Sequence, residues 1–323
     1  VNGTLRAEGT EASPVVFTSF KDDSYGGDTN NDGTATVPAG ADWSGVYLYA
    51  TAGQSVMRYC VIRYGGYSEY NPNNGQWYGP RAGMYIEGSN PTIDHCSISK
   101  IAYYTTAETY GIKLKDASPT ISNNSFSMVG SNQTAIYCEG SSGPSIMSNM
   151  LSGGGLGIRL LNTSSTTLEG NVFTGNGTGV RLENTSSATI DGNEFNGGGT
   201  GVFVWDSSGA LITNNTFTAN SSPISWYSSS AITVQNNTLT NCSTMGLYFS
   251  AAINKDMVLG LSIGMPFVFD SVTVNSGVTL TIEPGTVVKF KSTNSKLIVN
   301  GTLRAEGTEA SPVVFTSFKD DSY

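Results

Sequence analysis

The sequence predicts an all-β solenoid whose coils have about 22 residues and three short parallel strands each. Leu168, Ile190 and Ile212 are separated by a constant step, and a step of this length is typical of a solenoid. Each repeat holds short alternating runs rich in β-branched and aromatic residues, bounded by Gly, Asn, Ser and Thr. No repeat contains an apolar stripe of helix length. Since parallel crossovers are almost always right-handed, we expect a right-handed solenoid.

The apolar core positions follow one another along the chain, and the early coils are longer than the later ones. These positions are Ile93, Ile121, Ile146, Leu168, Ile190, Ile212 and Val234. A polar position also recurs, three residues after the core position, at Asn124, Asn149, Asn171, Asn193, Asn215 and Asn237. The whole pattern resembles the right-handed parallel β-helix of secreted, pectate-lyase-like solenoids, and the recurring asparagines resemble the internal asparagine ladder of that fold. Such a ladder is physically reasonable because buried amides on neighbouring coils can satisfy one another's hydrogen bonds.

Composition and charge argue against two kinds of partner, nucleic acid and the membrane interior. The formal net charge is −9, and charged residues make up only 13% of a chain rich in Gly, Ser, Thr and Asn. No basic stripe is present to neutralise phosphates, so we expect no nucleic-acid partner. No run of 18 apolar residues occurs, so we expect no membrane span in this segment.

Two cysteines occupy the coil position that asparagine takes later. Cys60 and Cys96 should therefore lie on neighbouring coils, where a strand spacing of about 4.8 Å permits contact between the sulfur atoms. Two interpretations stay open: a pair of buried thiols that replace rungs of the ladder, or a disulfide.

The two ends of the chain carry the same sequence. Val1–Tyr25 and Val299–Tyr323 are identical letter for letter, which chance cannot produce. We infer one period of a tandem array, with identical neighbouring modules as head-to-tail partners. The predicted organisation is a body of coils over 1–250, an irregular junction over 251–271, and the opening coils of the next module over 272–323.

A long polar loop between Lys21 and Trp43 carries a candidate metal site. Asp28, Asn30 and Asp32 place oxygen ligands at alternate positions before a glycine, as calcium loops do. The twelfth position of such a loop requires a carboxylate, and here it holds Ala39, which departs from the pattern. We predict a structural Ca²⁺ here, as the one cofactor of the chain, with Asp22 or Asp23 as further ligands. The alternative is a solvated acidic turn.

The longer early coils carry an aromatic cluster in their extra loop residues. Loops on a rigid scaffold are common binding sites, and aromatic rings stack on sugars or dock proteins. The predicted partner face consists of Tyr67, Tyr70, Trp77, Tyr78, Tyr103 and Tyr104. The alternative is a self-packed loop that covers one flank of the solenoid.

Asn-x-Ser/Thr sequences offer candidate glycosylation sites. We single out Asn132, Asn162, Asn176, Asn184 and Asn220.

The series Leu280-Thr-Ile-Glu-Pro-Gly285, Val299-Asn-Gly-Thr-Leu303 and Pro312-Val-Val-Phe-Thr-Ser317 resembles the opening coils of secreted bacterial β-helix repeat proteins. The resemblance implies an extracellular or cell-surface setting. We therefore expect a non-catalytic structural module that forms a rod, filament or surface-layer fibre by head-to-tail continuation. Two alternatives stay open: a carbohydrate-binding adhesin that uses the Tyr/Trp loops, with glycans as partners, and a calcium-dependent polysaccharide lyase or hydrolase, for which we assign no catalytic residue.

Overall fold

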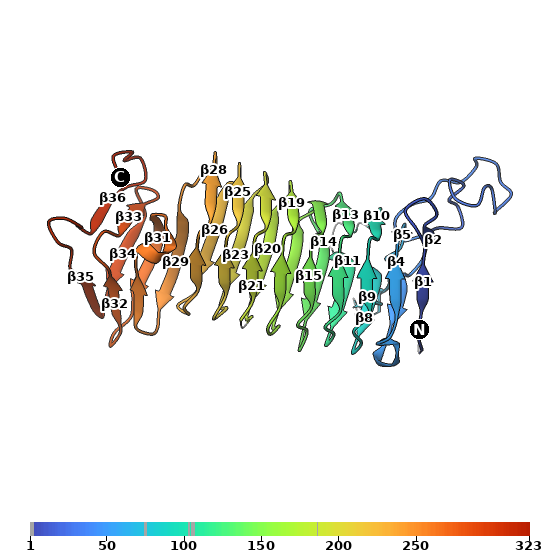
Figure 1. Ribbon diagram of the computed structural model, residues 1–323, viewed down its shortest axis with the longest axis horizontal. Coiled ribbons are helices and arrows are strands. Elements are labelled where there is room, and N and C mark those ends of the chain that lie inside the picture. Colours follow the sequence, from blue (N-terminus) through green and yellow to red (C-terminus); the bar gives the residue numbers. More distant parts are fainter. Residues whose placement is uncertain (1–2, 74–75, 103, 105–106, 186) are drawn as a thin grey trace. The chain divides into compact units, whose positions relative to one another are not determined.

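A computed structural model describes residues 3–73, 76–102, 104, 107–185 and 187–323 (Figure 1). The chain forms two compact units, Val1–Gly177 and Thr178–Tyr323. Within the described residues the only helices are two short 3₁₀ turns, η1 (Ala50–Ala52) and η2 (Leu261–Ile263), and no helix there is long and apolar enough to cross a membrane. The prediction of an all-β parallel solenoid is confirmed.

The first unit contains three parallel sheets, and each of its first five coils contributes one strand to each of them, while the sixth contributes to the first two. The first sheet is β1 (Arg6–Glu8), β4 (Val56–Arg58), β9 (Thr92–Asp94), β12 (Thr120–Ser122), β15 (Ser145–Met147) and β18 (Thr167–Glu169). The second is β2 (Val15–Phe17), β5 (Cys60–Arg63), β10 (Ser97–Ser99), β13 (Ser125–Met128), β16 (Met150–Gly153) and β19 (Val172–Thr174). The third is β3 (Val46–Leu48), β8 (Ala82–Glu87), β11 (Thr109–Lys115), β14 (Gln133–Glu139) and β17 (Leu156–Leu161). A small antiparallel hairpin joins β6 (Glu69–Asn71) and β7 (Gln76–Tyr78).

The second unit repeats this arrangement and then departs from it. Its first sheet is β21 (Thr189–Asp191), β24 (Leu211–Thr213) and β27 (Thr233–Gln235), and its second is β22 (Glu194–Asn196), β25 (Thr216–Thr218) and β28 (Thr238–Thr240). Its third is β20 (Thr178–Glu183), β23 (Thr200–Trp205), β26 (Ser222–Tyr227), β29 (Leu247–Ile253), β31 (Phe267–Val274), β33 (Val287–Phe290) and β36 (Val314–Ser317), with β34 (Lys296–Val299) also paired to β31. A further sheet contains β30 (Met257–Leu259), β32 (Thr279–Ile282) and β35 (Thr302–Ala305).

Alternation of side chains along each strand builds the core. In the first unit Ile121 pairs with Ile93 on one side and Ile146 on the other, and all three are fully buried. In the second unit the rings of Phe195 and Phe217 stack with centroids 4.8 Å apart. Like residues therefore lie above one another on successive coils, and burial of these columns supplies the main driving force for folding.

A left-handed backbone residue makes the sharp turn between the first and second sheets. Asn123 (φ +57°) and Ser148 (φ +56°) occupy this position in the first unit, and Asn214 and Asn236 (both φ +56°) in the second. Asparagine tolerates this conformation better than most residues, which explains part of the asparagine content of the turns. The next residue in each case is a rung of the asparagine ladder.

Candidate functional site

A ladder of asparagine side chains fills the turn between the first and second sheets of the first unit. The Nδ2 of Asn149 donates to the carbonyl oxygen of Ile121 and to Oδ1 of Asn171, both at 2.9 Å. Its Oδ1 accepts from the backbone N–H and from Nδ2 of Asn124, again at 2.9 Å. The three asparagines are at most 1% exposed. Each rung thus connects its own coil to two others without leaving a buried amide unpaired.

The second unit contains a ladder of the same kind. Nδ2 of Asn193 donates to Oδ1 of Asn215 at 3.0 Å, and Nδ2 of Asn215 donates to Oδ1 of Asn237 at 3.0 Å. The structure thus places all six predicted rungs in this turn, three in each unit.

Cys60 and Cys96 continue the ladder position towards the start of the first unit. The backbone N–H of Cys96 donates to Oδ1 of Asn124 at 2.8 Å, as the asparagine rungs do. The Cys96 thiol donates to the carbonyl oxygen of Met57 at 3.4 Å, and the Cys60 thiol to that of Ala7 at 3.3 Å. Both are buried free thiols, and a hydrogen bond between them together with burial raises the pKa of Cys96. The structure therefore corresponds to the first interpretation, two thiols in place of rungs, and contains no Cys60–Cys96 disulfide.

Burial corrects two of the predicted glycosylation sites. Asn176 is 3% exposed and its Nδ2 donates to the carbonyl oxygen of Gly153; Asn220 is 2% exposed and donates to Gly197 at 3.0 Å. Their amides connect coils at the turn after the second sheet and are closed to a glycan, so this part of the prediction is wrong. The remaining predicted acceptors are two exposed residues and one partly buried residue: Asn162, Asn184 and Asn132. Their glycosylation stays a prediction.

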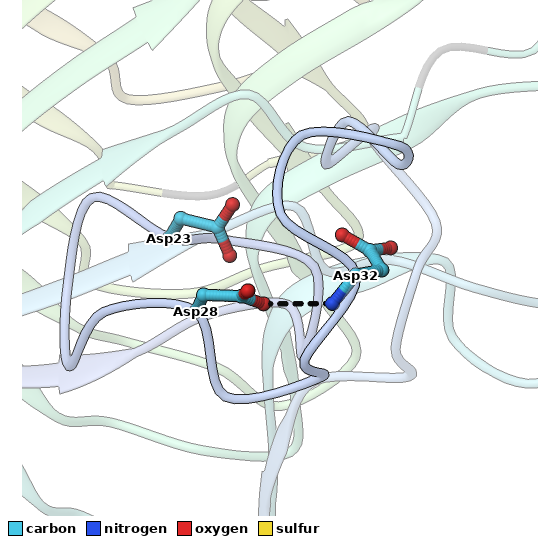
Figure 2. Close-up of side chains that lie close together, drawn as sticks. All are labelled: Asp23, Asp28 and Asp32. Atoms are coloured by element: carbon cyan, nitrogen blue, oxygen red, sulfur yellow. Dashed lines mark hydrogen bonds between the residues drawn. The ribbon is translucent and has the colours of Figure 1, made fainter.

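The polar loop after β2 brings three carboxylates together. One carboxylate oxygen from each of Asp23, Asp28 and Asp32 lies within 4.8 Å of the others (Figure 2). Asp28 shapes the turn, because its oxygens accept the backbone N–H groups of Asp32 at 3.1 Å and Gly33 at 2.8 Å. The structure adds Asp23 to the predicted set, and alternation along the loop alone could not have chosen it over Asp22.

Three oxygen atoms of this loop are buried without a hydrogen-bond partner. They are Oδ1 of Asp23, Oδ1 of Asn30 and Oδ1 of Asp32. The Nδ2 of Asn30 donates to the other carboxylate oxygen of Asp32 at 2.9 Å. Burial, and then the negative charges of Asp28 and Asp32, raise the pKa of Asp23. Unpaired oxygens and mutual repulsion are the features that a bound cation would relieve.

Asp22 is held apart from this cluster by Arg63. Its Oδ2 accepts from the guanidinium Nε at 2.7 Å, and the Arg63 side chain also lies over the ring of Tyr25, 4.4 Å from its centroid. Burial alone would raise the pKa of Asp22, but hydrogen bonds from Thr18 and Arg63 outweigh it and lower the pKa to about 2. Asp22 therefore anchors the start of the loop to β5 and is not a ligand candidate.

The predicted aromatic face is described only in part. Tyr103 and the side chains of Tyr70 and Trp77 lie outside the described residues. Tyr67 and Tyr78 are 47% and 50% exposed. The hydroxyl of Tyr104 accepts the backbone N–H of Ser68 at 3.4 Å, and Ser68 Oγ donates to the carbonyl oxygen of Tyr78 at 2.7 Å. Tyr104 therefore packs within the loops, whereas Tyr67 and Tyr78 present ring surface to solvent.

A second aromatic group lies on the outer face of the third sheet in the second unit. The rings of Phe203 and Tyr227 stack 5.0 Å apart, and Tyr227 meets Tyr248 at 5.4 Å. Arg181 lies over Phe203 at 5.0 Å and Lys291 over Tyr248 at 4.4 Å. Neighbouring rings and cations thus occupy the ring faces along this column. These contacts stabilise the sheet. Trp205 lies beside Phe203 and Tyr227, with ring centroids 6.2 Å from each, and is 48% exposed.

The two identical segments fold alike. The N–H groups of Thr10 and Ser13 each donate to the other's carbonyl oxygen, at 3.0 and 3.1 Å, and Thr308 and Ser311 repeat the pair at 3.1 and 3.2 Å. β1 and β2 form from the first copy, and β35 and β36 from the second. The first copy pairs with the coil that follows it, β4 and β5. The second pairs with the coil that precedes it, β32 and β33.

Comparison with known proteins assigns the family. Residues 95–260, about half of the chain, match the family described as periplasmic copper-binding protein (NosD). The chain belongs to the NosD family. No curated protein sequence matches it. Among solved structures, this NosD-family chain is similar to the "Streptococcus pneumoniae surface protein and adhesin PfbA", with a TM-score of 0.39 and 10% identity over 85% of this chain and 91% of that one.

Proposed function

We propose that the chain is a structural module of a cell-envelope or cell-surface protein in which identical copies follow one another head to tail. The observation that carries this proposal is the duplicated segment, which folds alike at both positions and pairs on opposite sides. The word periplasmic in the family's description supports a location outside the cytoplasm. The role is mechanical and architectural rather than catalytic.

A physical argument supports head-to-tail succession. The terminal coil of a solenoid leaves strand edges unpaired and core side chains uncovered. In the last coil Val299 and Phe315 are both 41% exposed, whereas their partners on the preceding coil, Val274 and Val288, are fully buried. A following copy would cover these side chains, so succession removes an unfavourable surface at every boundary.

Electron microscopy of the native protein tests the proposal. Material purified from the cell envelope should show unbranched rods whose lengths increase in equal steps, one step for each copy. Mass spectrometry of the same material should find a ratio of Val1–Tyr25 sequence to Ser165–Ala219 sequence well below the two to one of a single module, approaching one to one as the number of copies rises. Compact particles with a single module would overturn the proposal.

We also propose that the acidic loop binds Ca²⁺ rather than the copper named in the family's description. The chain has one histidine, and its four cysteines are buried. Within the described ranges, the only group of three or more potential His, Cys, Asp or Glu ligands is Asp23, Asp28 and Asp32. Oxygen ligands favour hard cations such as Ca²⁺, whereas copper favours imidazole, thiolate and thioether ligands.

The duplicated sequence offers a matched control for this metal. Asp321 is the copy of Asp23 in the second segment. Ca²⁺ should raise the melting temperature of the protein, D23N should abolish the shift, and D321N should leave it unchanged. A shift produced by Cu²⁺ and not by Ca²⁺, or an equal effect of the two variants, would contradict the proposal.

Glycan binding is the second candidate function, and the exposure of Tyr67 and Tyr78 favours it. Aromatic rings with open faces are the usual platform for sugars. Binding to a glycan array should fall at least tenfold in Y67A, while F20A, which removes a ring that is 69% exposed in a different loop, should bind normally. Equal binding by the two variants would remove this candidate.

A further inference from the structure

The sheets of the second unit do not all end in the same way. The first and second sheets stop at β27 and β28 within the described residues, and η2 packs against β27. The third sheet continues through β29 and β31, and these strands are longer than those before them, with 7 and 8 residues. At these two strands the sheet pairing of the preceding coils changes.

β29 and β31 divide the third sheet into two. The first half of β31 pairs with β33 through Phe267–Phe269, and the second half pairs with β34 through Ser271–Val274. A β-bulge separates the halves: Phe249 pairs with Phe269 but Ala251 pairs with Val272, so one residue of β29 faces two of β31. A bulge bends the strand that carries it, which allows the halves to diverge.

Asp270, at the bulge, is held from both neighbouring coils. Its Oδ2 accepts the hydroxyl of Tyr248 at 2.8 Å and its Oδ1 accepts the hydroxyl of Ser295 at 3.1 Å. Tyr248 belongs to β29, and Ser295 lies in the turn before β34. The bulge is therefore supported by side-chain bonds and is a built feature of the coil rather than an irregularity at a chain end.

The identical segments indicate which sheet of the next module each of these sheets corresponds to. β36, on the first branch, overlaps the copy of β2, which begins the second sheet of the first unit, because Val16 and Phe17 recur as Val314 and Phe315. β35, in the sheet that starts at β30, overlaps the copy of β1, which begins the first sheet. β34, on the second branch, directly precedes β35, in the place of a third-sheet strand.

The strand register is compatible with pairing on both sides of the repeated segment. Ala305 pairs with the buried Ile282, and its copy Ala7 pairs with the buried Met57. Phe315 pairs with the buried Val288, as its copy Phe17 does with the buried Ile62. An error of one residue in either register would place these side chains on the outer face. Both registers instead align these side chains with core residues of the neighbouring coil.

We propose that, in the tandem array of the proposed function, successive modules form an uninterrupted solenoid in which the strands change sheets at each boundary. The first half of the third sheet of one module becomes the second sheet of the next, its second half becomes the third sheet, and β30 starts the first sheet. The partner of the β35–β36 edge is therefore β4 and β5 of the following copy. The bulge at Asp270 is where the third sheet divides, so that its strands can enter the second and third sheets of the next module.

Hydrogen exchange on a two-module protein, residues 1–298 followed by residues 1–323, tests this junction. In the 323-residue chain, the N–H groups of β35 and β36 that face away from β32 and β33 exchange at the rate of an open edge. In the two-module protein the same groups at the boundary should exchange at least about a hundredfold more slowly, because they pair with the next copy. Unchanged exchange would overturn the continuous junction.

Matched variants at the boundary separate pairing from general destabilisation. A305D places a charge in the core column, whereas R304D changes the outward neighbour. In the two-module protein A305D should remove the added protection and R304D should retain it. Cryo-electron microscopy should place the boundary copy of Val314–Ser317 between β33 and the next β5; placement beside β4 or β8 would exclude the change of sheets. An alternative outcome is an array of modules in which the boundary N–H groups of β35 and β36 still exchange as rapidly as at an open edge. That result would reject this inference and leave the proposed tandem function intact.

Discussion

Asparagine and cysteine occupy the same turn of the first unit, and they hold it differently. The Asn149 side chain contacts the coils on both sides through four hydrogen bonds of 2.9 Å, two of them accepted by its Oδ1, and its Nδ2 also donates to Met147 of its own coil at 3.0 Å. Cys96 offers only a thiol, which donates to carbonyl oxygens at 3.4 Å. The position therefore requires a small buried side chain with a donor. Only asparagine also supplies the acceptor that extends the ladder.

The coil of the cysteine rung carries an ion pair at its rim. Asp94 pairs with Ser122, which pairs on its other side with Met147, so an acid and a thioether occupy equivalent positions two coils apart. The Asp94 carboxylate accepts from Arg58 Nε at 3.0 Å and from Asn123 Nδ2 at 2.9 Å. The Cys96 coil thus combines a backbone bond to the ladder with charged contacts at its rim.

The largest effect should come from removing an amide in the middle of the ladder. N149L keeps the volume approximately and leaves the donors of Asn124 without an acceptor, so we expect a loss of about 4 kcal/mol in the free energy of unfolding. Urea denaturation measures it. N162G, at an exposed turn residue with φ +55°, should change stability by less than about 0.5 kcal/mol. A loss below about 1 kcal/mol in N149L would mean that the ladder is not an important source of stability.

An exchange of the two rung types should give an asymmetric result. N149C removes the acceptor from the middle of the ladder and should cost about 2 kcal/mol. C96N, at the border of the ladder, should change stability by less than about 1 kcal/mol, since Asn124 already accepts its backbone N–H. Both values come from the same denaturation assay. Equal costs would show that volume alone determines which residue this turn accepts.

Acid should weaken the coil of the cysteine rung through Asp94. Burial would raise the pKa of Asp94, but hydrogen bonds from Asn123 and His95 outweigh it and lower the pKa to about 2. Since the folded-state pKa lies below the ordinary value, the carboxylate stabilises the fold above about pH 4, and this contribution is lost as the pH falls towards 2. Unfolding curves at pH 7, 4 and 2.5 should show a smaller acid-induced loss in D94N than in the wild type. Identical pH dependence would exclude Asp94 as a source of the acid response.

The smallest effect is expected from a reductant. Because Cys60 and Cys96 are free thiols, dithiothreitol should leave the unfolding midpoint unchanged, and four thiols should react with iodoacetamide after denaturation without reduction. Two reactive thiols and a lower midpoint in reductant would instead establish the disulfide that the sequence left open.

Much of this architecture could be predicted because a solenoid brings residues together at a fixed separation along the sequence. A constant step between Leu168, Ile190 and Ile212 forces equal side chains onto successive coils, so the sheets, the core columns and the rungs at Asn149 and Asn193 follow from spacing alone. The site in the polar loop followed only in part. Alternation selected Asp28 and Asp32, but the loop must fold before Asp23 is known to join them and Asp22 to bind Arg63.

What the sequence determined by itself is the repeat: the coil, the ladder and the identity of Val1–Tyr25 with Val299–Tyr323. The tertiary structure decided which asparagines are buried: Asn176 and Asn162 share a glycosylation motif, but Asn176 is buried and bonded to another coil, whereas Asn162 is exposed. It also decided how β29 and β31 divide one sheet into two. Periodicity describes contacts between equivalent positions, whereas a bulge, a loop cluster and a change of sheets depend on contacts between positions that no period relates.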